Sequence, residues 1–148
     1  MPNFDNSETI KSIVISGGTH GNEMSGIAAV KHWQQNPKIL SEAAPSTTIS
    51  LTLVNEAAMA NRLRFVDEDI NRLFTEEALR KGLSDSEEQI SREKSIAQKF
   101  NNEFGPKGNA KSDFCIDIHN TTSNMGPTLI VLENDAFHQQ LARFVKTA

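Results

Sequence analysis

A short apolar run that stops at a glycine pair and leads into an amphipathic segment constrains the fold of this chain more than any other feature. Residues 13–15, Ile-Val-Ile, are followed closely by Gly17 and Gly18, as expected for a buried strand that ends in a turn. Over residues 22–35 the apolar side chains recur at helical spacing. The chain therefore begins with a strand–turn–helix unit.

The rest of the chain continues this alternation. Strands are predicted at residues 48–54, 113–119 and 128–132, and amphipathic helices at residues 84–104 and 136–146. Residues 36–46 are predicted to be a connection, and residues 55–74 form a less regular segment. The strand at 48–54 alternates strictly, which indicates a half-buried strand near a sheet edge. The long helix would open at a capping box, residues 84–87, and end at Gly105. This order predicts an α/β protein, a three-layer α/β/α arrangement around a mostly parallel mixed sheet.

Composition narrows the function classes. The chain has 148 residues with 37% hydrophobic and 23% charged content, which is typical of one soluble globular domain. The net charge is −4 and no basic stripe is present, so neither nucleic acid nor a membrane is expected as a partner. The N-terminus does not resemble a signal peptide. With Cys115 as its single cysteine, the chain is expected in the cytoplasm.

Three residues able to bind a metal ion lie at the ends of predicted strands. His20 and Glu23 follow the first strand, and His119 ends the strand at 113–119. Ligands of such sheets bind outside the carboxyl ends of the strands, so the three side chains are expected at one edge. Two imidazoles and a carboxylate form an attested catalytic zinc set with an open position. The short pattern His-x-x-Glu, taken alone, favours a glycine-rich turn with a solvated histidine and a first-turn glutamate, but the shared strand-end position of all three residues favours one Zn²⁺ per chain.

Further polar residues flank these ligands. Asp117 lies two residues before His119 on the same side of the strand, where a carboxylate can orient the histidine or be satisfied by backbone N–H groups. Arg64, Asn71 and Arg72 lie in a segment dense in Asn, Arg and Asp. Arginine recognises a carboxylate with paired hydrogen bonds, which suits an acidic substrate. Taken alone, the segment is more typical of a solvated loop of Arg–Asp pairs, and the predicted zinc set beside it is what favours substrate binding.

Several strings together carry a family resemblance. Gly-Thr-His-Gly-Asn-Glu at 18–23, Asp-Ile-Asn-Arg-Leu-Phe at 69–74, Phe-Gly-Pro-Lys at 104–107 and Asp-Ile-His-Asn-Thr-Thr-Ser-Asn-Met-Gly at 117–126 closely resemble the aspartoacylase and succinylglutamate desuccinylase family of zinc carboxypeptidase-like hydrolases. The resemblance runs from about Ile13 to the end of the chain.

The resemblance implies zinc-dependent deacylation of a small acidic N-acyl amino acid, such as N-acetyl-L-aspartate. By motif match, His20, Glu23 and His119 would bind zinc; Arg64, Asn71 and Arg72 would hold the substrate or polarise its carbonyl, with Arg64 as the catalytic residue; Asn55 and Asn120 would line the pocket. Arg64 matches by its place three residues before Asp67 and not by an identical string.

The chain also departs from the family pattern. The family's general-base glutamate lies in a downstream Glu-Val-Gly-Pro-like segment, and a mainly β domain caps the pocket; this chain ends at Ala148, before both. Glu133 does not match the base motif. Residues 1–148 are thus interpreted as the N-terminal part of a zinc-binding catalytic domain, expected to bind zinc but to turn over little substrate. Succinylglutamate desuccinylase, another N-acyl amino acid acylase and a non-catalytic zinc- or metabolite-binding module stay open, as does a homo-oligomer.

Overall fold

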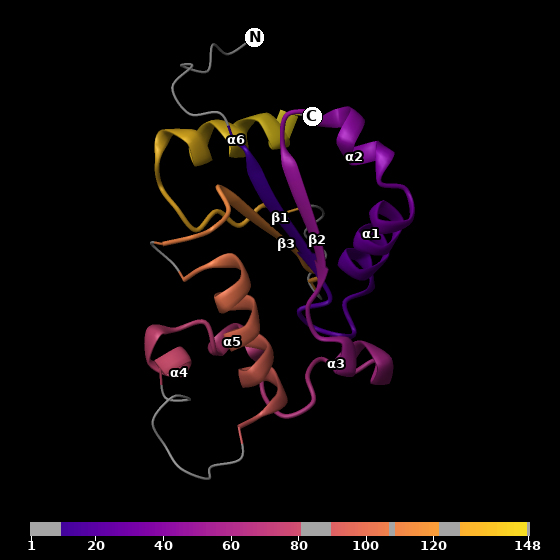
Figure 1. Ribbon diagram of the computed structural model, residues 1–148, viewed down its shortest axis with the longest axis vertical. Helices are drawn as coiled ribbons and strands as arrows, with labels where there is room; N and C mark the ends of the chain where they lie inside the picture. The colour runs from indigo at the N-terminus through magenta and orange to yellow at the C-terminus, as the bar shows by residue number, and fades with distance from the viewer. Residues whose placement is uncertain (1–9, 81–89, 107–108, 122–127, 148) are drawn as a thin grey trace.

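Strands are separated by helices along the chain, and the three strands of the described residues form one parallel sheet (Figure 1). The computed structural model describes residues 10–80, 90–106, 109–121 and 128–147. In chain order its elements are β1 (Ser12–Gly17), α1 (Met24–Gln35), α2 (Lys38–Ala43), β2 (Thr48–Leu53), α3 (Glu56–Asn61), the 3₁₀ helix η1 (Ile70–Arg72), α4 (Glu76–Arg80), α5 (Arg92–Phe104), β3 (Phe114–Ile118) and α6 (Ala136–Thr147).

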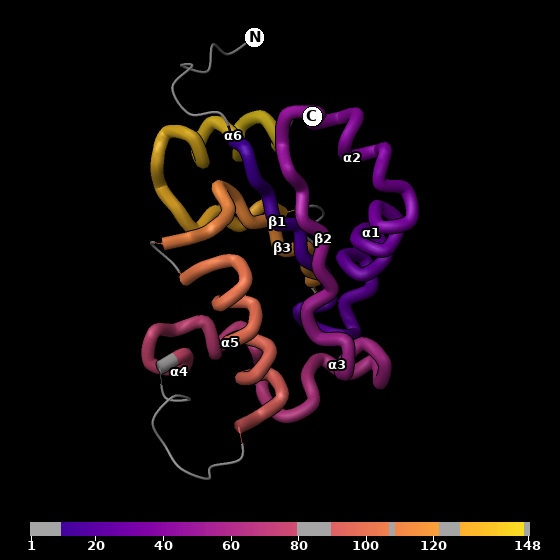
Figure 2. Tube along the Cα trace, viewed as in Figure 1, coloured from indigo at the N-terminus to yellow at the C-terminus, as the bar shows by residue number. Residues whose placement is uncertain are grey.

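The apolar strand β1 lies in the centre of the sheet. The strand order is β2-β1-β3, and both neighbours pair with β1 in parallel. In Figure 2 the trace of β1 runs between β2 and β3, which come from distant parts of the sequence. Gly17 pairs with Leu53 on one side and Ile118 on the other. The carboxyl ends of all three strands therefore meet at one edge.

Helices flank the sheet on both sides, which confirms the predicted α/β arrangement. Helix α1 contacts all three strands and buries Ile27 and Val30. In Figure 1, α5 and α6 lie on the other side of the strands. Helix α6 approaches β3 through the Phe137 ring, whose centroid is 5.8 Å from that of Phe114. Helix α5 buries Ala97 in a small apolar cluster with η1.

Some predicted elements were wrong. Residues 128–132 are not a strand. No described strand pairs with them, and Ile130 and Leu132 are 80% and 85% exposed. This apolar run therefore gains neither hydrogen bonds to a neighbouring strand nor burial. The predicted connection at 36–46 contains α2, and the less regular segment at 55–74 contains α3 and η1. Short helices of this kind have too few turns to show a clear period.

The long helix begins later than predicted. Ser91 is its N-cap, and its side chain accepts a hydrogen bond from Lys94 N. The predicted capping box at 84–87 lies outside the described residues. The predicted end of the helix is confirmed, because Gly105 is the C-cap of α5 with a φ of 88°.

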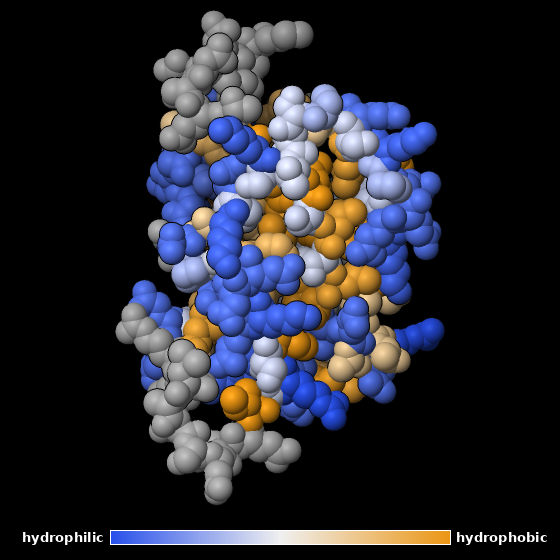
Figure 3. All heavy atoms as spheres, in the orientation of Figure 1, coloured by the Kyte–Doolittle hydropathy of each residue, from blue (hydrophilic) through white to orange (hydrophobic). Residues whose placement is uncertain are grey.

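The edge strand β2 is only half-buried, as its alternating sequence predicted. On the face seen in Figure 3, apolar side chains reach the surface along the middle of the molecule, and hydrophilic side chains border them.

Within the described part of the chain, no helix has the length and apolarity needed to cross a membrane.

Candidate metal centre

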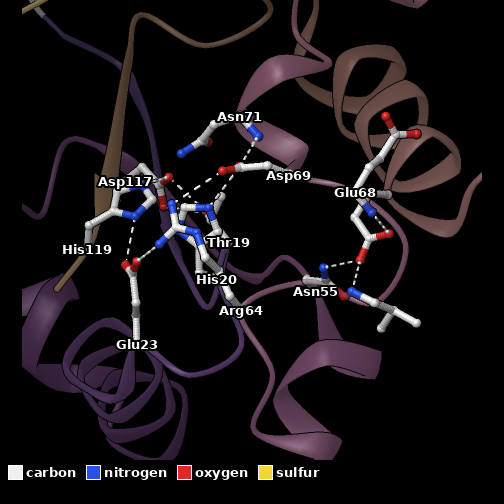
Figure 4. A network of polar contacts seen from close by, with 12 residues as sticks. Thr19, His20, Glu23, Asn55, Arg64, Glu68, Asp69, Asn71, Asp117 and His119 are labelled. Carbon is white, nitrogen blue, oxygen red and sulfur yellow. Dashed lines mark hydrogen bonds and ion pairs between the residues drawn. The ribbon is translucent and has the colours of Figure 1, made fainter. Parts of the chain in front are cut away.

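The three predicted metal ligands lie together at the carboxyl edge of the sheet (Figure 4). His20, Glu23 and His119 each offer one ligand atom, and these atoms lie within 4.8 Å of one another. Glu23 is shared by the two imidazoles: Oε1 is 2.8 Å from His20 Nδ1, and Oε2 is 2.8 Å from His119 Nδ1. His20 and Glu23 are buried, whereas His119 is exposed. This donor set, open on one side, suits a metal ion that keeps a position for another ligand.

The turn between β1 and α1 brings His20 and Glu23 to this point. Gly18 has a φ of +71°, a conformation that glycine adopts without steric cost. At Gly21 a Cβ atom would lie 2.1 Å from the backbone carbon of Ala58, so the turn can pack against α3 only with glycine here. The backbone N–H of Glu23 then donates to His20 O at 3.1 Å and closes the turn. The sequence places both ligands by backbone geometry.

A carboxylate lies behind each histidine. Asp117 Oδ2 is 2.6 Å from His119 Nε2, and Asp69 Oδ1 is 3.0 Å from His20 Nε2. In metal sites such a carboxylate holds the proton of a neutral histidine on Nε2, so that Nδ1 can bind the metal ion. The Nδ1 atoms are also the ones that face Glu23. Both imidazoles are thus arranged as metal ligands are.

Asp69 is a residue that the sequence interpretation missed. Forty-nine positions separate it from His20, so no local spacing connects the two. The available signal was its place at the head of the Asp-Ile-Asn-Arg string. Asp117 had been predicted to orient His119, and its own carboxylate accepts hydrogen bonds from Ser16 Oγ at 2.8 Å and Thr19 Oγ1 at 2.9 Å. Both carboxylates are therefore held in place.

The centre concentrates negative charge. The hydrogen bond from His20 lowers the pKa of Asp69 to about 2 despite partial burial. Burial would raise the pKa of Asp117, but its hydrogen bonds, first that from His119, lower it below the usual range. The Asp117 carboxylate raises the pKa of His119 to about 9 against the effect of burial, and Glu23 adds to this rise. Such a group of anions favours a cation at the shared point.

Arg64 borders the ligands. Its Nη1 donates to Glu23 Oε1 and its Nη2 to Asp69 Oδ2, each at 3.3 Å. The side chain is 49% exposed, so part of the guanidinium faces solvent at the open side of the centre. The Arg–Asp pair foreseen as the alternative for this segment does form, and it forms beside the metal ligands. The backbone O of Arg64 also accepts from Gly21 N at 3.2 Å.

Three other predicted substrate residues, Asn71, Arg72 and Asn120, lie next to residues of the candidate centre in the sequence or in space. Asn71 and Arg72 are exposed on η1, and Asn71 N donates to Asp69 Oδ1 at 3.1 Å. Asn120 N donates to Glu23 Oε2 at 2.9 Å, and its side chain bonds Ser25 at the start of α1.

Asn55 is fully buried away from the ligands (Figure 4). Its side chain accepts from Ala58 N, so it caps α3, and donates to Glu93 Oε1 at 2.9 Å. Both the oxygen and the nitrogen of this amide therefore form hydrogen bonds within the protein. This geometry favours a role in holding the backbone, and contact with substrate stays a prediction.

A model of the succinylglutamate desuccinylase/aspartoacylase catalytic domain matches residues 9–148. The chain belongs to this family. An N-acyl-aromatic-L-amino acid amidohydrolase (carboxylate-forming) of Xenopus laevis is 41% identical over 142 residues, 95% of this chain and 44% of that protein. Aspartoacylase of Mus musculus is 40% identical over 142 residues, with the same coverage of 95% and 44%.

A solved structure has the same fold. The crystal structure of murine aminoacylase 3 matches with a TM-score of 0.84 at 36% identity, covering 96% of this chain and 45% of that one. The predicted zinc carboxypeptidase-like α/β fold is thereby confirmed. The chain spans less than half the length of these relatives.

Proposed function

We propose that this chain carries the metal centre of a zinc-dependent hydrolase that deacylates small N-acyl amino acids, with N-acetyl-L-aspartate giving aspartate and acetate. One observation carries the proposal: two imidazole Nδ1 atoms and a carboxylate converge, and a carboxylate lies behind each imidazole. Family membership supports the reaction class. Because the chain spans less than half of its relatives, we assign turnover to the whole protein that contains it.

His20, Glu23 and His119 would hold one zinc ion. The chemistry that this ion supplies when bound is polarisation of a carbonyl group and activation of water near neutral pH. Asp69 and Asp117 keep the proton of each histidine on Nε2, so that both Nδ1 atoms are available. Histidines without these carboxylates would lose their fixed orientation.

The cationic and amide side chains would bind the substrate. Arg64, 3.3 Å from Glu23, is suited to stabilise negative charge that develops on the amide oxygen beside the ligands. Arg72 and Asn71 lie exposed on η1, directly after Asp69. Their hydrogen-bond donors would hold the carboxylates of an acidic substrate, which arginine binds through two parallel bonds. Asn120, anchored between Glu23 and Ser25, would border the same pocket.

A second substrate class has its own support. The 41% identical Xenopus laevis relative is an amidohydrolase of N-acyl-aromatic-L-amino acids, and deacylation of such substrates by the same centre is our second candidate. An aromatic side chain would need apolar lining in place of a second carboxylate clamp. The preference for acidic or aromatic side chains therefore separates the two candidates.

The test measures the release of free amino acid by the longest protein that contains this sequence, loaded with zinc or stripped by a chelator. The substrates are N-acetyl-L-aspartate, N-succinyl-L-glutamate and N-acetyl-L-phenylalanine. Zinc-dependent release from the aspartate derivative supports the first proposal, and preference for the phenylalanine derivative supports the second. Zinc-dependent binding without release from any substrate would identify a non-catalytic binding module instead.

A further inference from the structure

Glu93 is a fully buried carboxylate with no part in the chemistry described above. Four N–H donors surround it. Its Oε1 accepts from Val66 N at 2.7 Å and Asn55 Nδ2 at 2.9 Å. Its Oε2 accepts from Asp67 N at 3.0 Å and, more weakly, from Glu68 N at 3.4 Å. Three of the four donors are consecutive backbone amides, so one side chain of α5 fixes one short piece of chain.

The contact is reciprocal. Asp67 Oδ2 accepts from Arg92 N at 2.9 Å, at the first residue of α5. Ser91, the N-cap of α5, donates from its hydroxyl to Glu68 Oε1. The first turn of α5 and residues 66–68 therefore hold each other by side chain and backbone in both directions. We name this arrangement the α5 clasp.

The α5 clasp lies between the two groups that contact the metal ligands. Arg64 lies two residues before Val66, and Asp69 directly follows Glu68. Both side chains reach the candidate centre: Arg64 contacts Glu23, and Asp69 contacts His20. Figure 4 shows Asn55 and the segment carrying Glu68 on one side, and the ligands on the other. Because the clasp fixes the backbone between Arg64 and Asp69, it also limits where these two side chains can lie.

We propose that Glu93 is a positioning residue whose buried carboxylate, acting through residues 66–68, sets Arg64 and Asp69 against Glu23 and His20. Its effect on the metal ion rests on the proposed function, whereas its hold on the backbone does not. The carboxylate must be ionised, because all four partners are donors. A glutamine would turn amide hydrogens toward N–H groups and leave at least one donor unsatisfied.

The first experiment needs no metal. Backbone amide hydrogen exchange is compared in three metal-free proteins: the unaltered chain, Glu93→Gln and Glu103→Gln. Glu103→Gln is the control, because it changes an exposed glutamate on the same helix. In Glu93→Gln we expect exchange at least about tenfold faster at Val66 and Asp67, from the lost charged hydrogen bonds, and also at Asn71, whose amide bonds Asp69. Amides of β1 should stay protected. Faster exchange that stops at residue 67 would overturn the proposal.

If Glu93→Gln does not fold, hydrogen exchange of the unaltered chain tests the proposal instead. Under increasing denaturant, the amides of Val66, Asp67 and Asn71 should open together as one unit. Independent opening of Asn71 would overturn the proposal.

The second experiment measures zinc affinity by competition with a chromophoric chelator in Glu93→Gln, Asp69→Asn and the double variant. If Glu93 acts through Asp69, each single change weakens zinc binding by about tenfold or more, and the double variant is no weaker than Asp69→Asn alone. Additive losses, or an unchanged affinity in Glu93→Gln, would contradict the positioning role. If the unaltered chain binds no zinc, the proposed function fails, and the exchange data alone decide on Glu93.

Discussion

Replacing Asp69 with asparagine should lower the zinc affinity of the chain about 10–100-fold, the usual effect of removing a group that supports a metal ligand from behind. Asp69 Oδ1 is 3.0 Å from His20 Nε2, and its pKa of about 2 keeps it ionised at neutral pH. Asparagine has the same size but no charge, so His20 loses the charged partner of its Nε2 atom while the packing is preserved. The change corresponds to about 1.4–2.7 kcal/mol of binding free energy.

The assay is competition for zinc with a chromophoric chelator at neutral pH. Asp135→Asn is the matched control, because Asp135 also faces a histidine, His138 Nδ1 at 2.7 Å, but lies exposed outside the centre. The control should bind zinc as the unaltered chain does. If Asp69→Asn binds equally well, the carboxylate behind His20 does not support a metal ligand, and the interpretation of this side of the centre is wrong.

Three further results are expected. Arg72→Lys should retain zinc but weaken turnover of an acidic substrate in the longest protein containing the sequence, because lysine cannot form the paired bonds of arginine; unchanged kinetics would remove Arg72 from the substrate site. Ile70→Ala should lower the free energy of unfolding in urea by about 2–5 kcal/mol, since Ile70 is fully buried against Ala97, and a change under about 1 kcal/mol would contradict this packing. Burial raises the pKa of Glu93, but its hydrogen bonds outweigh burial and hold this pKa below the usual 4.5. The stability that the ionised Glu93 contributes is therefore present above pH 4.5 and is lost as the pH falls through the lower pKa of the folded state. The difference in urea midpoint between the unaltered chain and Glu93→Gln should therefore shrink between pH 7 and about pH 3, and a constant difference would show that charge is not its source.

The grouping of His20, Glu23 and His119 at one edge could be predicted from sequence because it depends on rules that act locally. A strand that stops at glycines ends near Gly17, and the strand predicted at 113–119 ends at His119. Parallel strands then bring their carboxyl ends to one edge whatever lies between them. The same rule does not specify which side chains stand behind the ligands.

Asp69 and Glu93 could not be found in this way. Asp69 reaches His20 from a segment without regular periodicity, and Glu93 looks like an ordinary polar residue of an amphipathic helix until the fold buries it among backbone amides. Their roles depend on how loops pack, which local sequence patterns do not encode. The wrong strand at 128–132 has the same origin: an apolar run forms a strand only where a neighbouring strand offers hydrogen bonds.

The central claim is that His20, Glu23 and His119 hold a zinc ion, and native mass spectrometry of the purified chain tests it most directly. The unaltered chain should carry one zinc ion, and so should His32→Ala, which changes an exposed histidine on α1. His119→Ala should lose most of its zinc, because only two of the three ligands remain. Equal zinc content in all three proteins would contradict the assignment of the centre.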